Sequence, residues 1–329
     1  MENHNHPENK HTLTLPSGRI LAWTIHGGPL KNAITTDADA KPPAIIFYFH
    51  GFPGCSLEAN FLSTALLQRH NARCIAIDRP GMDQSTHDPE RRLLDWPADV
   101  LAIADHLGIP QFSIIGASGG GPYALACAHA IPRVDTSSPD VTVQRGRGRL
   151  RGVALVCAMY PTSLGLKGML TELKVVLAVG RWVPRFITAA VLDRLIGRKA
   201  RAKDRAVLEK SMDGAMAKRP EAERQAWDDA RVRATGVGSL RGAFRQGGMP
   251  VATELRLLSS NDWGFRVEDV DGNGLRLWHG MLDQNAPFEM AEKAARLMPG
   301  AKTHFFEKAG HLSMAAEHID AIVADLVGG

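Results

Sequence analysis

Short continuous apolar runs alternate with longer segments of helical periodicity along most of the chain. The run AIIFYFHG at 44–51 is typical of a strand buried on both faces of a sheet, whereas 93–108 repeats apolar positions every three to four residues and stops at Gly108. Residues 11–27 alternate apolar and polar positions around Pro16-Ser17-Gly18, which predicts a hairpin. Further strands are expected at 72–81, 111–116, 153–159, 274–280 and 301–307, and helices at 56–70, 93–108, 120–132, 287–298 and 318–328.

Strands that alternate with helices form βαβ units and therefore a mostly parallel sheet with helices on both faces. Between residues 160 and 252 only helical periodicity occurs, which predicts an all-helical insertion lying as a cap over the C-terminal edge of the sheet. We expect an α/β fold with a doubly wound, mostly parallel, eight-stranded sheet. Its parts are a disordered tail at 1–12, a core at 13–159 and 253–329, and the helical cap at 160–252.

The composition indicates a folded protein and says little about its partners; the motifs described below favour a small-molecule substrate. The chain has 329 residues, 44% of them hydrophobic, and 39 basic residues stand against 35 acidic ones, a balance that does not imply nucleic acid. A Gly- and Arg-rich loop at 133–152 is interpreted as solvated rather than as a nucleic-acid arm, and 29–43 is a second polar stretch. The cap helices at 164–180 and 185–197 are apolar enough to suggest membrane docking, but Lys174, Arg181 and Arg185 interrupt them. We therefore favour their packing against the core.

The four cysteines lie far apart and mostly in apolar runs, so they are expected to be reduced and buried, with no C-x-x-C pair for zinc or redox chemistry. No apolar run approaches the roughly 18 residues that span a membrane, and the N-terminus is polar. We expect a cytoplasmic protein without stable membrane insertion, metal or cofactor. The oligomeric state stays open.

The stretch SIIGASGGGPYALA at 113–126 carries the most specific chemical signal. A phosphate-binding loop needs a Lys near its glycines, but no Lys or Arg occurs between Gly116 and Arg133, and the spacing of a dinucleotide fingerprint is also absent. The pattern G-x-S-x-G between a strand and a helix fits instead, because small neighbours allow a strained turn that exposes the hydroxyl of Ser118.

A serine nucleophile needs a base and an acid that orients the base. Among the histidines, His50, His279 and His311 follow strands at the edge where open α/β sheets place their sites. Asp283 also follows a strand, whereas Asp271 precedes one. The amides of Phe52, in HGFPG, and of Gly119, after Ser118, are the expected oxyanion donors.

The ordered motifs HGFPG, DRPGMDQS, GASGGG, HGMLDQNAP and GHLS resemble the α/β-hydrolase superfamily over nearly the whole chain. The resemblance implies Ser118 as nucleophile, His311 as general base and acid, Asp283 as its orienting acid, and Phe52 and Gly119 as the oxyanion hole. DRPG matches a structural turn of the family, so neither Asp78 nor Arg79 receives a catalytic role. Substrate contacts are expected from His50, Gly51, Tyr123 and Trp182.

The expected activity is hydrolysis of a small to medium, largely apolar carboxylic ester through an acyl-enzyme. Dehalogenases and epoxide hydrolases of this fold carry Asp at the position of Ser118, which disfavours their substrates. Two other hydrolases stay open. One resembles proline iminopeptidases and would need Glu172, Glu209 or Glu254 to bind an amine; the other cleaves carbon–carbon bonds in diketones. A non-catalytic ligand-binding member of the fold is a further alternative, against which the complete triad argues.

Overall fold

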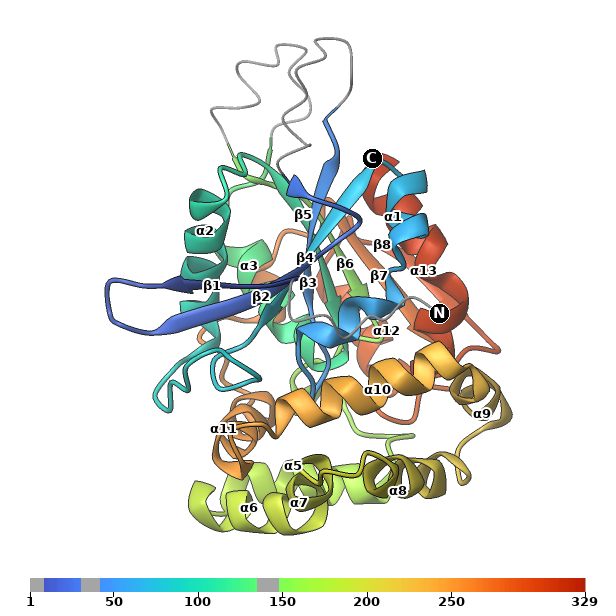
Figure 1. The fold of residues 1–329 in the computed structure, drawn as a ribbon. Helices are drawn as coiled ribbons and strands as arrows, with labels where there is room; N and C mark the ends of the chain where they lie inside the picture. Colours follow the sequence, from blue (N-terminus) through green and yellow to red (C-terminus); the bar gives the residue numbers. More distant parts are fainter. Residues whose placement is uncertain (1–8, 31–41, 135–147, 329) are drawn as a thin grey trace.

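The computed structural model describes residues 9–30, 42–134 and 148–328, and its centre is one eight-stranded sheet (Figure 1). The strands lie in the order β1-β2-β4-β3-β5-β6-β7-β8. Their bounds are β1 (Lys10–Thr14), β2 (Ile20–His26), β3 (Ala44–Phe49), β4 (Ala72–Asp78), β5 (Phe112–Ala117), β6 (Leu150–Val156), β7 (Leu275–Gly280) and β8 (Lys302–Phe306). The α/β class and the predicted strands are confirmed.

The six strands β3 to β8 are parallel, and only the hairpin of β1 and β2 runs antiparallel to its neighbours. β3 lies at the middle, where Ile46 pairs with Cys74 of β4 on one side and with Ser113 of β5 on the other. Because all these strands point the same way, the chain leaves β3, β5, β7 and β8 at one common edge. The candidate residues follow these four strands.

Helices cover both faces of the sheet, which gives the doubly wound arrangement. One apolar core joins the sheet to α2 (Trp96–His106), α3 (Gly121–Ala130) and α12 (Phe288–Leu297). The other joins it to α1 (Thr64–Arg69) and α13 (His311–Gly328). All four cysteines are buried with free thiols, as predicted.

The segment between β6 and β7 is helical, and its helices form two layers beyond the C-terminal edge of the sheet (Figure 1). α10 (Ala230–Ala243) and α11 (Gly248–Ser259) lie toward the sheet. The outer elements are α5 (Thr171–Trp182), α6 (Arg185–Leu192), a π-helical turn, η7 (Asp193–Gly197), α7 (Arg198–Ala200) and α8 (Ala206–Met216), with α9 (Glu221–Asp228) leading into α10. Short 3-10 turns are η3 (Ser56–Phe61), η4 (Leu93–Asp95), η5 (Ser118–Gly120), η6 (Thr162–Leu164) and η8 (Val267–Asp269).

Several predicted boundaries differ from the structure. β1 begins at Lys10, inside the expected tail, and it pairs along its whole length with β2. The predicted end of the cap at residue 252 falls within α11. Within the expected helical segment, the stretch 221–243 is divided into α9 and α10, because the Asp229 side chain accepts from the amides of Arg231 and Val232 and starts α10. Residues 1–8 of the tail expected at 1–12 and most of the polar loops at 29–43 and 133–152 lie outside the described residues.

The last helix is longer than predicted, since α13 begins at His311 and not at residue 318. The predicted helix at 56–70 is a 3-10 turn followed by the short helix α1. Across the three described ranges, no helix combines the length and the apolar character that crossing a bilayer requires.

Candidate active site

Ser118 lies on a strained turn between β5 and α3. Its φ is +51°, a region that a residue with a side chain rarely occupies. The turn packs tightly: a Cβ at Gly120 would lie 2.1 Å from the carbonyl oxygen of Phe49, so only glycine fits there. The amide of Met159 also donates to the Ser118 carbonyl at 3.0 Å. The predicted strand–turn–helix context of G-x-S-x-G is therefore present.

The loop that leaves β3 packs directly against this turn. A Cβ built on Gly119 would lie 2.6 Å from Phe52 Cβ and 3.0 Å from the Phe52 amide nitrogen. A Cβ on Gly51 would lie 3.3 Å from Ser118 Cβ. The two backbone segments that carry the predicted oxyanion donors are thus in contact, beside the serine.

A buried ion network holds in place the loop that follows β3. The guanidinium of Arg79, which is fully buried, donates to the carbonyl oxygens of His50 and Gly51, the latter at 2.9 Å. Its Nε donates at 2.6 Å to Glu254 of α11, which also accepts from Arg91 at 2.6 Å and from the Tyr123 hydroxyl at 3.0 Å. Arg79 thus positions the loop, which the reading of DRPG as a simple structural turn had not identified.

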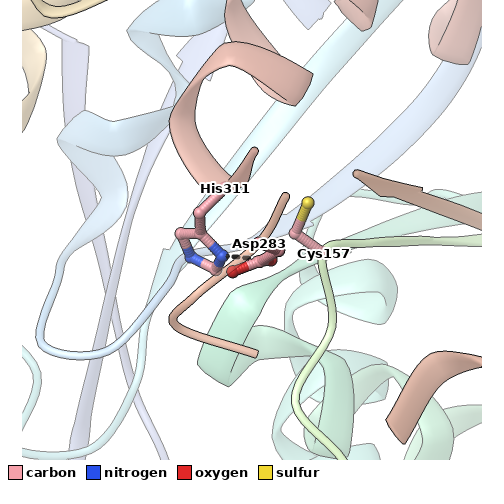
Figure 2. A group of neighbouring side chains, drawn as sticks. All are labelled: Cys157, Asp283 and His311. Carbon is pink, nitrogen blue, oxygen red and sulfur yellow. Dashed lines mark hydrogen bonds and ion pairs between the residues drawn. The ribbon is translucent and has the colours of Figure 1, made fainter. Parts of the chain in front are cut away.

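His311 and Asp283 form a hydrogen-bonded pair at the same edge of the sheet. Figure 2 shows the imidazole against the carboxylate, with His311 Nδ1 2.7 Å from Asp283 Oδ2. The other carboxylate oxygen accepts from the amides of Asn285 at 2.7 Å and Ala286 at 3.0 Å. Since Nδ1 is engaged, Nε2 of His311 is the nitrogen left for a substrate or a nucleophile.

The electrostatics of the pair favour a charged imidazole beside a charged carboxylate. Burial alone would raise the pKa of Asp283, but the charge and hydrogen bond of His311 outweigh it and hold that pKa below its usual value. Burial alone would lower the pKa of His311. The charge and hydrogen bond of Asp283, followed by the charges of Glu223 and Glu58, raise it above its usual value. The nearby His279 is buried and its pKa is lowered, so it stays neutral.

Cys157 stands next to the pair, and Cys157, Asp283 and His311 bring possible metal ligands within 4.8 Å of one another (Figure 2). Burial raises the pKa of the Cys157 thiol well above its usual value, so the sulfur is a thiol and not the thiolate that binds metals. Asp283 is also committed to three hydrogen bonds. The donor chemistry fits a hydrogen-bonded cluster better than a metal site.

Two carboxylates near the pair come from outside the predicted motifs. Glu223 of α9 is 6% exposed and accepts from the amides of Leu312 and Ser313 at 3.0 Å, in the first turn of α13. Glu58 accepts from the Gly51 amide at 2.8 Å and from the Tyr48 hydroxyl at 3.0 Å. Its other oxygen would lie 3.2 Å from a Cβ on Gly51, at the point where Ser118 also approaches. No sequence motif pointed to Glu223, whose contacts lie 89 and 90 residues away; Glu58 lies only eight residues after the HGFPG histidine.

The structure brings together most, but not all, of the predicted site. Ser118, Gly51, Phe52 and Gly119 share one contact region. The bonded pair of His311 and Asp283 follows β8 and β7 at the same edge of the sheet. Three predicted substrate contacts lie elsewhere or are inaccessible. His50 is fully buried, Tyr123 is 1% exposed and bonded to Glu254, and Trp182 is 76% exposed at the end of α5, beside the Arg181 guanidinium.

Comparison with known proteins agrees with this architecture. The model of the family described as "Alpha/beta hydrolase family" matches residues 46–325. The chain is 32% identical over 98 residues to the sn-1-specific diacylglycerol lipase ABHD11 of Mus musculus, a match that covers 30% of this chain and 32% of the lipase. The aligned part therefore spans about a third of that curated relative.

Solved structures share the fold over nearly all of the chain. A hydrolase from Pseudomonas aeruginosa PA01 superposes with a TM-score of 0.61 at 17% identity, covering 98% of this chain and 100% of its own. A thermophilic esterase from Thermogutta terrifontis gives 0.61 at 16%, covering 97% and 98%. An enol-lactonase from Burkholderia xenovorans LB400 gives 0.60 at 18%, covering 97% and 100%. The family match over most of the length shows that this chain belongs to the Alpha/beta hydrolase family and is a hydrolase of that type.

Proposed function

We propose that the protein is a serine hydrolase that cleaves a carboxylic ester through an acyl-enzyme on Ser118. The observation that carries the proposal is the strained turn at Ser118, with φ +51°, packed against the β3 loop at the sheet edge that also carries the bonded pair of His311 and Asp283. A strained turn that exposes a hydroxyl next to a base and its acid is the arrangement that activates a serine.

In the acylation step, Ser118 Oγ forms a bond to the ester carbonyl carbon while His311 Nε2 takes the hydroxyl proton. The carbonyl π electrons move to the oxygen, and the amides of Phe52 and Gly119 donate to that oxyanion. The carbon–oxygen bond to the alcohol then breaks, and the imidazolium gives its proton to the leaving oxygen. Asp283 favours the charged imidazole during this step and keeps Nε2 directed at the serine.

In the deacylation step, water takes the place of the alcohol. His311 Nε2 removes a proton from the water as its oxygen bonds to the acyl carbon, and the oxyanion again lies at the amides of Phe52 and Gly119. Collapse of the intermediate breaks the bond to Ser118, whose oxygen recovers the proton from His311. The acid leaves, and the enzyme returns to its starting state.

Two of the three carboxylates that could bind the amine of a peptide substrate are already engaged, which favours an ester. Glu254 is fully buried and bonded to Arg79, Arg91 and Tyr123, so it offers no free oxygen to a substrate ammonium. Glu209 accepts from Arg205 at 2.6 Å, and Glu172 lies exposed in the first turn of α5. The esterase and the enol-lactonase among the similar structures also have acyl–oxygen substrates by name.

The test is hydrolysis of a short p-nitrophenyl ester by the wild type and by Ser118→Ala. We expect turnover to fall at least about a thousand-fold in the variant, to the level left by substrate binding and oxyanion stabilisation. Ser113→Ala, in β5 before the turn, is the matched control. Equal turnover in the wild type and Ser118→Ala would contradict the proposal, and cleavage of an aminoacyl-proline or a diketone in preference to esters would redirect it.

A further inference from the structure

The outer face of α5, α6 and η7 exposes large apolar side chains that globular helices normally bury. Phe186 is 67% exposed, Leu195 58% and Val175 56%, and Trp182 at the end of α5 reaches 76%. Ile187 and Val191 add 43% and 44%. We call this set, Val175, Trp182, Phe186, Ile187, Val191 and Leu195, the outer apolar face.

The outer apolar face is one side of a regular helical pattern. From α6 through η7 to the first residue of α7, the exposed positions are 186, 187, 190, 191, 194, 195 and 198, which repeat with the period of a helix. The opposite side faces α11. Ala189 is buried there, and a Cβ on Gly248, the first residue of α11, would lie 2.3 Å from the carbonyl oxygen of Ala189. α5 packs in the same way, because a Cβ on its Gly180 would lie 2.5 Å from Leu255 of α11. Leu177 of α5 is buried in the core cluster, and Leu192 of α6 packs against it, as expected. The outer apolar face does not follow that expectation, because its side chains point away from the molecule.

Figure 1 shows where this face lies in the fold. α5, α6 and α7 form the layer farthest from the sheet, with α10 and α11 between that layer and the strands. The outward side of this layer is therefore an end of the molecule, free of the strands and of the helices that cover them.

The same segment carries a concentrated positive charge. Residues 171–200 contain six Lys and Arg and two acidic residues, a net charge of +4, which equals the net charge of the whole chain. The rest of the chain is therefore neutral overall. Arg194 and Arg198 lie on the exposed side of η7 and α7, in the same stripe as Leu195. Apolar side chains mixed with Trp and Arg on one helical face are typical of helices that lie in the interface of a bilayer.

We propose that the outer apolar face is a docking surface for an anionic lipid bilayer, with α5 and α6 lying in the interface plane. The apolar side chains enter the boundary between headgroups and acyl chains, and the guanidinium groups of Arg194 and Arg198 contact lipid phosphates. A second copy of the chain is a poorer occupant, since a two-fold contact places the same basic segment opposite itself. The docking chemistry does not depend on the reaction at Ser118.

The experiment is sedimentation of the full chain with vesicles of phosphatidylcholine, with or without phosphatidylglycerol. We expect binding to the vesicles that contain phosphatidylglycerol and a strong loss of it between about 0.1 M and about 1 M salt. Phe186→Ser/Leu195→Ser and Arg194→Gln/Arg198→Gln should each weaken the partition roughly tenfold or more. Matched controls are Ile20→Ser, an exposed apolar residue on β2, and Arg92→Gln/Arg296→Gln, two exposed arginines elsewhere; both should bind like the wild type.

Three results would overturn the proposal: no binding to either vesicle, binding that both test variants retain, or a dimer in lipid-free solution that Phe186→Ser/Leu195→Ser abolishes. Hydrolysis of a soluble p-nitrophenyl ester is measured in parallel. The test variants should keep the wild-type rate, which shows that they are folded. Loss of vesicle binding with full ester turnover thus separates this proposal from the proposed function.

Discussion

Glu223 offers a sharp test of how the inserted helices act on the candidate base. Its carboxylate accepts from two first-turn amides of α13, Leu312 and Ser313, and from the Ser313 hydroxyl, each at 3.0 Å, although it belongs to α9. First-turn amides have no acceptor within their own helix, so an outside carboxylate serves as their cap. His311 is the first residue of that helix. Glu223 therefore fixes the start of the helix that carries the base and also places a negative charge near its imidazole.

Two substitutions separate these effects. Glu223→Ala removes a cap, worth about 0.5–2 kcal/mol, and leaves buried donors unsatisfied at about 1–3 kcal/mol. We expect the free energy of unfolding to fall by about 2–4 kcal/mol and kcat to fall as much as roughly a hundred-fold if the imidazole moves by about 1 Å. Glu223→Gln keeps an acceptor oxygen and loses only the charge, at a cost of about 1 kcal/mol in stability.

The charge effect has a defined sign. The pKa of His311 is raised above its usual value because Asp283, Glu223 and Glu58 outweigh burial. His279 Nε2 lies 3.5 Å from the Asp283 oxygen that bonds to His311, and the charges of Glu223 and Asp283 act on Arg219. Ester hydrolysis needs the neutral imidazole, so kcat/KM rises as pH passes through this pKa. Without the Glu223 charge the imidazolium is less favoured, and the acidic limb of the profile moves to lower pH.

The assay is kcat/KM for a p-nitrophenyl ester against pH, together with urea unfolding. Glu221→Gln is the matched control, since Glu221 is an exposed acid on the same helix and accepts from Gln225. An acidic limb that stays in place in Glu223→Gln, or one that moves equally in Glu221→Gln, would refute the reasoning.

Three further predictions follow from the same contacts. Gly119→Ala places a methyl group 2.6 Å from Phe52 Cβ and should lower kcat roughly a hundred-fold or more with a folded protein by circular dichroism; wild-type kcat would show that the Phe52 and Gly119 amides hold no oxyanion. Asp283→Asn should lower kcat about ten-thousand-fold, because its amide cannot hold His311 in the required tautomer; a modest loss would mean that Asp283 is not the orienting acid. Glu254→Gln leaves Arg79 and Arg91 without their buried carboxylate, so the free energy of unfolding in urea should fall by about 3–5 kcal/mol. The control Glu90→Gln, in an exposed pair with Arg185, should lose about 0–1 kcal/mol. Similar losses in both variants would contradict the role of the network.

The sequence was informative where local pattern determines structure. Strand β3 is largely buried and appears in the sequence as the unbroken apolar run AIIFYF. The strained turn at Ser118 requires small neighbours, and the glycines around it are visible in the sequence. Because parallel strands end at one edge, the pairing of His311 with Asp283 followed from their places after β8 and β7.

The rest depends on contacts between distant residues. The start of α13 at His311 is capped by Glu223, which lies 89 residues from Leu312 in the sequence. The guanidinium of Arg79 is held by Glu254, which lies 175 residues away. Helical periodicity identifies an apolar stripe on α6 but does not tell which side is buried. From the sequence, Phe186 and Trp182 are therefore expected to be buried. In the structure they are exposed, and Ala189 and Gly180 lie at the contact with α11.

The central claim is that the hydroxyl of Ser118 is an activated nucleophile. Incubation of the folded protein with a fluorophosphonate, followed by peptide mass spectrometry, tests it most directly. We predict one stoichiometric phosphonyl adduct on Ser118, which is absent in Ser118→Ala and forms much more slowly in Asp283→Asn. A folded wild-type protein that stays unlabelled, or that carries the adduct on another residue, would contradict the account.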